Sequence, residues 1–224
     1  MNWDVFARKL QHLNRREVAT RYAYRALNRV VSLQCYFALA LTEASAREVN
    51  SSLQNIECRF IEAEVLRRES ENPDAGVTGT SLEQFLSSGE RCFGTFVNGT
   101  LAAQLWLADG RAHLSGDVWV QHDPAWAYSR WAHTRPEFRG HHLHAYTKRR
   151  ALDVLVREGQ RGILSVVDAA NFESQHSAAR VGCTRAGTFV LSQAGSQTVT
   201  WASPGCSAYG LRLEVQKPSP RPPG

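Results

Sequence analysis

The sequence lacks an apolar run long enough to cross a membrane. Its longest apolar stretch, Val30 to Leu41, is interrupted by Ser32 and Gln34, whereas a transmembrane helix needs about 20 consecutive apolar residues. The first residues are polar and charged, unlike the apolar segment of a signal peptide. No repeat of fixed period is present, which excludes a solenoid or propeller. We therefore expect a cytoplasmic protein, with peripheral attachment to a membrane as the alternative.

Paired cysteines are also missing. The five cysteines are scattered, odd in number and without CxxC spacing, so the sequence predicts neither a disulfide framework nor a zinc finger. We expect free thiols in a reducing compartment, and no metal site.

The composition is that of an ordinary globular protein, with 43% apolar and 21% charged residues in 224. This length predicts one main domain. The net charge is +5, and residues 1–33 alone carry seven basic against two acidic residues. The basic character therefore belongs to the N-terminus.

Residues 2–31 are predicted to form one or two amphipathic helices, with Arg21, Arg25 and Arg29 four apart on one face. This face is either solvated beside the core, which we favour, or binds phosphates or an anionic surface. Nucleic acid is not expected, because the aromatic residues are not interleaved with the arginines as a base-stacking surface would require. We divide the chain into a basic helical extension (1–54), a main domain (55–216) and a disordered proline-rich tail (217–224), and we expect residues 32–42 to bury against the main domain as a helix or strand.

The centre of the sequence is a strand, a basic turn and a helix. A strand is predicted over 127–134, a proline turn follows at 135–137, and an apolar stripe from Leu143 onward predicts a helix. A further apolar strand over 163–168 is expected to pair in parallel with 127–134. Unpaired N–H groups at the start of a helix bind phosphate readily, so the turn is a candidate phosphate site.

Several motif pieces occur in order along this region. They are Thr134-x-Pro136-x-x-Arg139-Gly140-x-x-Leu143, Asn171-x-x-Ser174 and Val181-Gly182-Cys183. In this order the sequence resembles the GCN5-related N-acetyltransferases (GNAT) over roughly residues 55–202. The resemblance implies an α/β (α+β) fold: a mixed, mostly antiparallel sheet with a central parallel pair, split in a V, and helices on both faces. It also implies an N-acyltransferase that moves an acetyl or longer acyl group from coenzyme A (CoA) to a primary amine within a ternary complex.

The resemblance also implies which residues bind acetyl-CoA or another acyl-CoA. The main chain of one strand would bind the pantetheine, the turn would bind the pyrophosphate, and the next loop would complete the site. In that order these are Ala132, His133 and Thr134; Arg139, Gly140, His141, His142, Leu143 and His144; and Asn171 and Ser174.

The turn departs from the family pattern, because His142 and His144 stand where small residues are usual. A histidine can crowd the cofactor there, since glycine allows close approach. A protonated imidazole can instead donate a charge-assisted hydrogen bond to phosphate. The histidines can also be solvated residues at a helix start. Their adjacency in sequence does not converge three rings on one metal ion.

Catalytic residues are less defined. Many relatives use a glutamate on the central strand, but residues 127–130 read Ala-Tyr-Ser-Arg. The candidates for acid–base roles are His133, Tyr128 and Asp123, of which His133 has the suitable pKa range. The family's tyrosine acid has no counterpart between Tyr146 and Tyr209, which leaves water or Ser177. We interpret Cys183 as a small core residue.

Three alternatives stay open for the function. The chain can be a catalytically degenerate protein that binds acyl-CoA without turnover. It can take its acyl group from acyl carrier protein, whose acidic surface would suit the arginine face. Its acceptor amine can be a small molecule or a membrane-associated lipid precursor.

Overall fold

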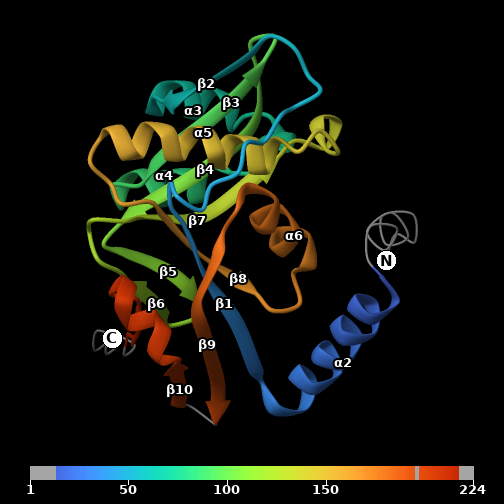
Figure 1. The fold of residues 1–224 in the computed structure, drawn as a ribbon, viewed down its shortest axis with the longest axis vertical. Coiled ribbons are helices and arrows are strands. Elements are labelled where there is room, and N and C mark those ends of the chain that lie inside the picture. Colours follow the sequence, from blue (N-terminus) through green and yellow to red (C-terminus); the bar gives the residue numbers. More distant parts are fainter. Residues whose placement is uncertain (1–13, 195–196, 217–224) are drawn as a thin grey trace, which may run out of the picture.

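An eight-stranded mixed sheet forms the centre of the computed structural model, which describes residues 14–194 and 197–216 (Figure 1). Its strands lie in the order β10-β9-β1-β8-β7-β4-β3-β2, and a small second sheet has the order β11-β6-β5. The strands are β1 (Leu33–Leu41), β2 (Ile56–Ile61), β3 (Arg91–Val97), β4 (Thr100–Asp109), β5 (Arg111–Ser115), β6 (Val118–Gln121), β7 (Ala127–Thr134), β8 (Ile163–Asp168), β9 (Thr184–Ala194), β10 (Gln197–Ala202) and β11 (Arg212–Val215).

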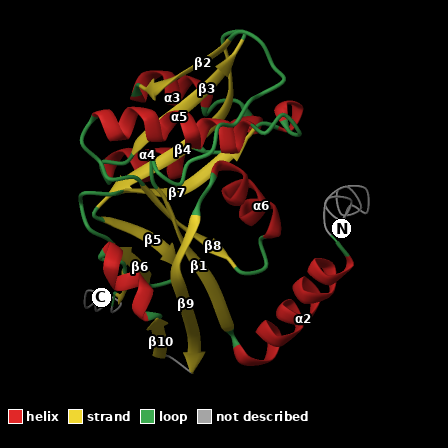
Figure 2. Cartoon of the chain, viewed as in Figure 1, coloured by secondary structure: helices red, strands yellow, loops and turns green. Residues whose placement is uncertain are grey.

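Helices cover both faces of the large sheet (Figure 2). They are α2 (Arg15–Val31), α3 (Ala63–Glu69), α4 (Gly79–Ser87), α5 (Leu143–Arg157) and α6 (Phe172–Val181), with short 3-10 turns η1 (Pro73–Ala75), η2 (Pro136–Phe138) and η3 (Pro204–Tyr209). Leu152 and Leu155 of α5 pack with Phe93 and Leu105 on one face of the sheet. Leu82 of α4 packs on the other face, against the strand side chains that alternate with those of the first face.

The expected sheet type is confirmed. β7 and β8 are parallel, and every other described strand pair is antiparallel. β3 and β4 form a hairpin whose turn residues, Asn98 and Gly99, are both at positive φ. The chain leaves β2 at Ile61 and α3 begins at Ala63, where Leu66 faces the core.

β1 corrects the expected domain boundary. It lies between β8 and β9 and pairs with both, so residues 33–41 belong to the main sheet and not to an N-terminal extension. Ala38 and Leu41 are fully buried. The physical reason is that β1 carries apolar side chains on both of its faces. These side chains are covered only when the strand lies inside the sheet, paired at both edges and packed on both faces.

α2 is the predicted N-terminal helix and begins at a capping box formed by Asn14 and Glu17. Figure 1 shows it running outward from the N-terminal end of β1. Arg21 donates to the Ala170 carbonyl at 3.0 Å and forms an ion pair with Glu173, so one arginine of the expected basic face joins the helix to the β8–α6 loop. Residues 1–13 and the tail predicted as disordered at 217–224 lie outside the described residues.

None of the described helices has the length and apolar character needed to cross a bilayer. All five cysteines are free.

Candidate functional site

The large sheet opens between its two parallel strands. β7 and β8 pair at three positions only, Ala127 with Ile163, Tyr128 with Leu164 and Ser129 with Ser165. Beyond Ser129, β7 stays paired with β4 alone, and the rest of β8 is paired with β1. The facing edges of the two strands therefore separate toward their C-terminal ends, which leaves main-chain groups of β7 available to an extended ligand.

A β-bulge marks the point where the strands part. On β4, Trp106 pairs with Trp131 and Leu107 pairs with Ser129, so Arg130 is an extra residue on β7. A bulge bends its strand and increases the local twist. The bend therefore turns β7 away from β8 directly after their last shared pair, and this is the local cause of the opening.

The basic turn closes the open end of the split. Gly140 has φ +89° and His142, the N-cap of α5, has φ +61°, so the chain turns sharply into the helix. Among residues 140–145, no backbone N–H group has an acceptor in the described part of the chain. Six donors at the positive end of a 15-residue helix make this turn suited to an anion such as a pyrophosphate.

Three side chains hold the turn in place. Arg139 is exposed and its Nε donates to the Thr134 carbonyl at 3.2 Å. Nδ1 of His141 lies 2.8 Å from Oγ of Ser52. Leu143 is buried under the turn. Leu143 is therefore an anchor, and the cationic group at the surface of the turn is Arg139.

His144 lies one position inside the helix and is half-buried. Burial, and then the charge of Lys148, lower its pKa to about 4. The imidazole is therefore neutral at pH 7 in the ligand-free protein.

Residues 132–134 line the separated part of β7. Ala132 packs on the α5 face. His133 points to the opposite face, where its ring stacks on Trp131 with 5.6 Å between centroids and its Nε2 lies 3.0 Å from the Asp74 carbonyl. Burial lowers the pKa of His133, with support from two nearby arginines. With Nε2 donating to Asp74, the Nδ1 atom of the neutral ring is the one that can accept a proton.

Tyr128 and Asp123 precede the separated segment of β7. Tyr128 is 2% exposed and stacks on His122 at the closed end of the split, and burial raises its pKa. Asp123 precedes β7, and its Oδ1 accepts the N–H of Ala125 at 2.9 Å. Tyr128 is therefore a core side chain, and Asp123 caps a turn.

Asn171 and Ser174 lie on the β8 side of the split. Asn171 is the N-cap of α6, and its side-chain oxygen accepts the Ser174 N–H at 3.1 Å. α6 packs beside α5, so the loop that carries Asn171 is near the helix that carries the turn.

Two buried ionic groups near the split were missed by sequence reasoning. Glu90, 6% exposed, forms an ion pair with Arg130 of the bulge. Burial raises the pKa of Glu90, and Arg130 partly offsets this. Lys148 of α5, 4% exposed, donates to Oγ of Ser165 at 2.9 Å. The only available signal was a charged residue within an apolar helix stripe, and such residues usually face solvent.

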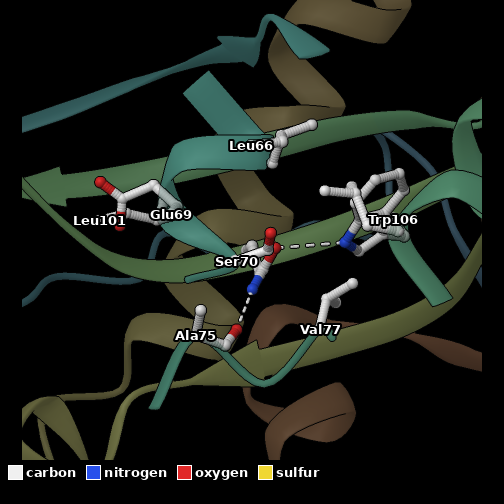
Figure 3. Close-up of a pocket in the computed structure, with 9 residues that line it drawn as sticks. Leu66, Glu69, Ser70, Ala75, Val77, Leu101 and Trp106 are labelled. Carbon is white, nitrogen blue, oxygen red and sulfur yellow. Dashed lines mark hydrogen bonds between the residues drawn. The ribbon is translucent and has the colours of Figure 1, made fainter. Parts of the chain in front are cut away.

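A small cavity lies on the α3–α4 face of the sheet, beside β4 (Figure 3). In it, Nε2 of Gln104 donates to the Ala75 carbonyl and Nε1 of Trp106 donates to Oε1 of Gln104 at 3.2 Å. Glu69 at its rim forms an ion pair with Arg135, which follows β7 directly. The cavity therefore lies on the face to which His133 points. No group of three or more metal-ligating side chains is found among the described residues.

Comparison with known proteins rests on structure. No family model matches the sequence, and no curated protein is significantly similar to it. A GNAT-family acetyltransferase from Colwellia psychrerythraea superposes with a TM-score of 0.54 at 15% identity, covering 76% of this chain and 60% of that one. A GCN5-related N-acetyltransferase from Sphaerobacter thermophilus gives 0.53 at 14% identity, with 76% and 55% covered. The chain has the GNAT fold.

The likeness to these structures concerns the fold. The chain spans about 60% and 55% of their lengths, and identities near 15% do not carry residue roles from one protein to another. The split and the turn are therefore described by this chain's own contacts.

Proposed function

We propose that this protein is an acyl-CoA-dependent N-acyltransferase that moves an acetyl or longer acyl group to a primary amine. One observation carries the proposal. The parallel pair separates after Ser129 and Ser165, and the separated end is capped by a turn with six unused N–H groups. An extended donor with a pyrophosphate at one end and an acyl thioester at the other fits this combination of an anion site and a free strand edge.

The residues divide the work of binding. The N–H groups of residues 140–145 and Arg139 bind the pyrophosphate, the edge of β7 at residues 132–134 binds the pantetheine, and the Asn171 loop closes the far side. When bound, the thioester supplies an already activated acyl group, so the protein's main task is to position donor and amine.

His133 is the candidate for deprotonating the amine. It lies on β7 within the separated segment, and its lowered pKa leaves it neutral at pH 7. A neutral imidazole with Nε2 bonded to Asp74 has Nδ1 available for a proton. The cavity on the same face is consistent with an acceptor that approaches from the α3–α4 side.

The acceptor is expected to be a small-molecule or lipid-precursor amine. The basic face of α2 favours a surface-bound acceptor or acyl carrier protein. On this face Arg25 is exposed, one helical turn after Arg21, which donates to the Ala170 carbonyl. Under this part of the proposal the helix holds the enzyme against an anionic surface, and the protein acts at the membrane periphery.

The rival function is acyl-CoA binding without turnover. It is favoured by the placement of Tyr128 and Asp123, neither of which reaches the split, and by the absence of a carboxylate on residues 127–134. Release of free CoA thiol across a panel of primary amines distinguishes the two: the rival requires binding without release.

The test is a thermal-shift titration with acetyl-CoA, free CoA and a long-chain acyl-CoA. A ligand at about 100 times its Kd adds about 2.7 kcal/mol to the free energy of unfolding, which corresponds to a rise of roughly 5–11 °C for a chain of this size. We expect such a rise for the wild type and its loss in Arg139→Glu, which places a negative charge at the anion site.

The matched control is Arg157→Glu, the same charge change at the opposite end of α5. It should keep the ligand-induced rise, because Arg157 is exposed and remote from the turn. No rise with any of the three ligands in the wild type would refute the proposed function. An equal loss in both variants would remove the turn as the binding site.

A further inference from the structure

Lys148 is an unusual residue in this chain. The sequence has three lysines against 23 arginines, and Lys148 is the only lysine among the described residues. It lies in the second turn of α5 and is 4% exposed. An ammonium is a more compact and more strongly hydrated charge than a guanidinium, so its burial requires a specific reason.

The ammonium lies at the closed end of the split. Its Nζ donates to Oγ of Ser165 at 2.9 Å, and Ser165 faces Ser129 in the last pair that β7 and β8 share. His144, one helical turn earlier, lies at the start of α5 beside the anion-binding turn. On the side of α5 that faces the split, His144 therefore lies at the open end of the split and Lys148 lies at its closed end.

The charge of Lys148 is not balanced within the described part of the chain. Among the described residues, Ser165 is the one hydrogen-bond partner found for its three donors, and no carboxylate of that part of the chain forms an ion pair with it. Asp153, the acid nearest in sequence, and Glu48 are engaged elsewhere, since both pair with Arg149 and Arg150. A buried cation without a counter-ion is costly, so an anion that forms at this point would be strongly stabilised.

We propose that Lys148 stabilises the thiolate of coenzyme A as the acyl group leaves it. This rests on the proposed function, which places the pyrophosphate at the turn and the thioester at the inner end of the split. In the transfer, the amine nitrogen forms a bond to the acyl carbon and the carbon–sulfur bond breaks. The bonding electron pair goes to sulfur, while the amine's proton goes to the base. The new sulfur anion then lies against the Lys148 ammonium, which takes the place of a tyrosine acid.

The groups around Lys148 leave its charge as the dominant influence on a bound thiol. On its own helix, His144 is neutral above about pH 4. On the strands beneath α5, Cys58 shares a hydrogen bond with Thr95, which in turn bonds Thr147, and burial raises the pKa of Cys58. Cys183, at the α6–β9 turn, packs against the same core. A cation beside a thiol lowers the thiol's pKa from about 8.5 toward 7.5 or less.

The experiment measures the ionisation of the thiol of bound CoA. The intact protein is saturated with free CoA, and the ultraviolet absorbance of the thiolate is followed as the pH is raised; desulfo-CoA, which lacks the sulfur, supplies the baseline. We expect the wild type to lower the pKa of the bound thiol by at least about one unit, a tenfold rise in thiolate. Lys148→Met, which keeps the apolar stem, should bind desulfo-CoA normally and return the thiol to its free pKa.

Arg157→Met is the matched control, because it removes one positive charge from the exposed end of the same helix. A thiol of unchanged pKa in wild-type protein that binds CoA would overturn the inference, whatever the folding of the variants. Transfer of an acyl group from acetyl-CoA to Lys148 itself, read by peptide mass, would also overturn it, since the lysine would then be an acceptor. Failure of both CoA and desulfo-CoA to bind would instead refute the proposed function.

Discussion

At the scale of single residues, His144 gives the protein a defined response to acid. Its pKa falls to about 4 in the folded state from an ordinary value of about 6.5. Below about pH 6.5 the His144 imidazole therefore binds a proton in the unfolded chain but not in the native protein. The free energy of unfolding decreases as the pH falls toward 4. His144→Asn should lose less melting temperature than the wild type between about pH 7 and about pH 5.

Burial lowers the pKa values of His122 and His133 as well, so acid will destabilise both the wild type and His144→Asn. The quantity that tests the prediction is the difference between them. Identical pH profiles for the wild type and His144→Asn would show that the folded imidazole titrates normally.

The site residues differ in how far sequence could place them. Arg139 and Gly140 were predictable, because a turn between a strand and a helix presents N–H groups whatever its side chains are. Lys148 was not, since its burial depends on the distance between α5 and β8, which no local pattern encodes. The burial of Tyr128 was not predictable, because the small second sheet that covers it comes from residues 111–121 and 212–215.

At the scale of elements, the Glu90–Arg130 pair joins the α4–β3 turn to the bulge of β7. Glu90 is 6% exposed, and the Arg130 guanidinium also lies over the Phe85 ring at 4.5 Å. Glu90→Ala leaves Arg130 largely buried without its partner, which should lower the free energy of unfolding by about 3 kcal/mol. Denaturant unfolding measures this difference.

Glu83→Ala is the control, from α4, the helix that precedes this turn. It breaks the exposed pair with Arg67 and should have little effect, because solvent screens exposed charges. Equal losses in the two variants would mean that burial does not distinguish these pairs. A loss in Glu90→Ala with weaker CoA binding would further indicate that the pair fixes the shape of the bulge.

Elements were predictable in proportion to how local their causes are. The β3–β4 hairpin depends on Asn98 and Gly99, which accept positive φ at low cost. β1 depends on strands far along the chain, because Leu33 pairs with Ser192 and Leu41 pairs with Ile163. The apolar sequence of β1 fits a helix or a strand equally well, and only pairing within the sheet decides between them.

At the scale of the whole molecule, β1 makes the N-terminal region indispensable. A protein lacking residues 1–54 would have a gap between β8 and β9, with two unpaired edges and an uncovered core. We expect it to lose cooperative thermal unfolding. A protein lacking only residues 1–31 keeps β1 and should still unfold cooperatively, since α2 contributes peripheral contacts such as that of Arg21. Calorimetry of the two truncated proteins makes the comparison. Cooperative unfolding of the protein that lacks residues 1–54 would restore a domain boundary at residue 54.

The position of β1 also has a consequence for the order in which the protein is made. A ribosome delivers β1 early, yet its partners are encoded more than 100 residues later. An apolar strand must therefore wait, exposed or held by a chaperone, until β8 and β9 emerge. Long-range pairing of this kind slows folding. The same strand that completes the sheet is thus the segment most exposed to aggregation during synthesis.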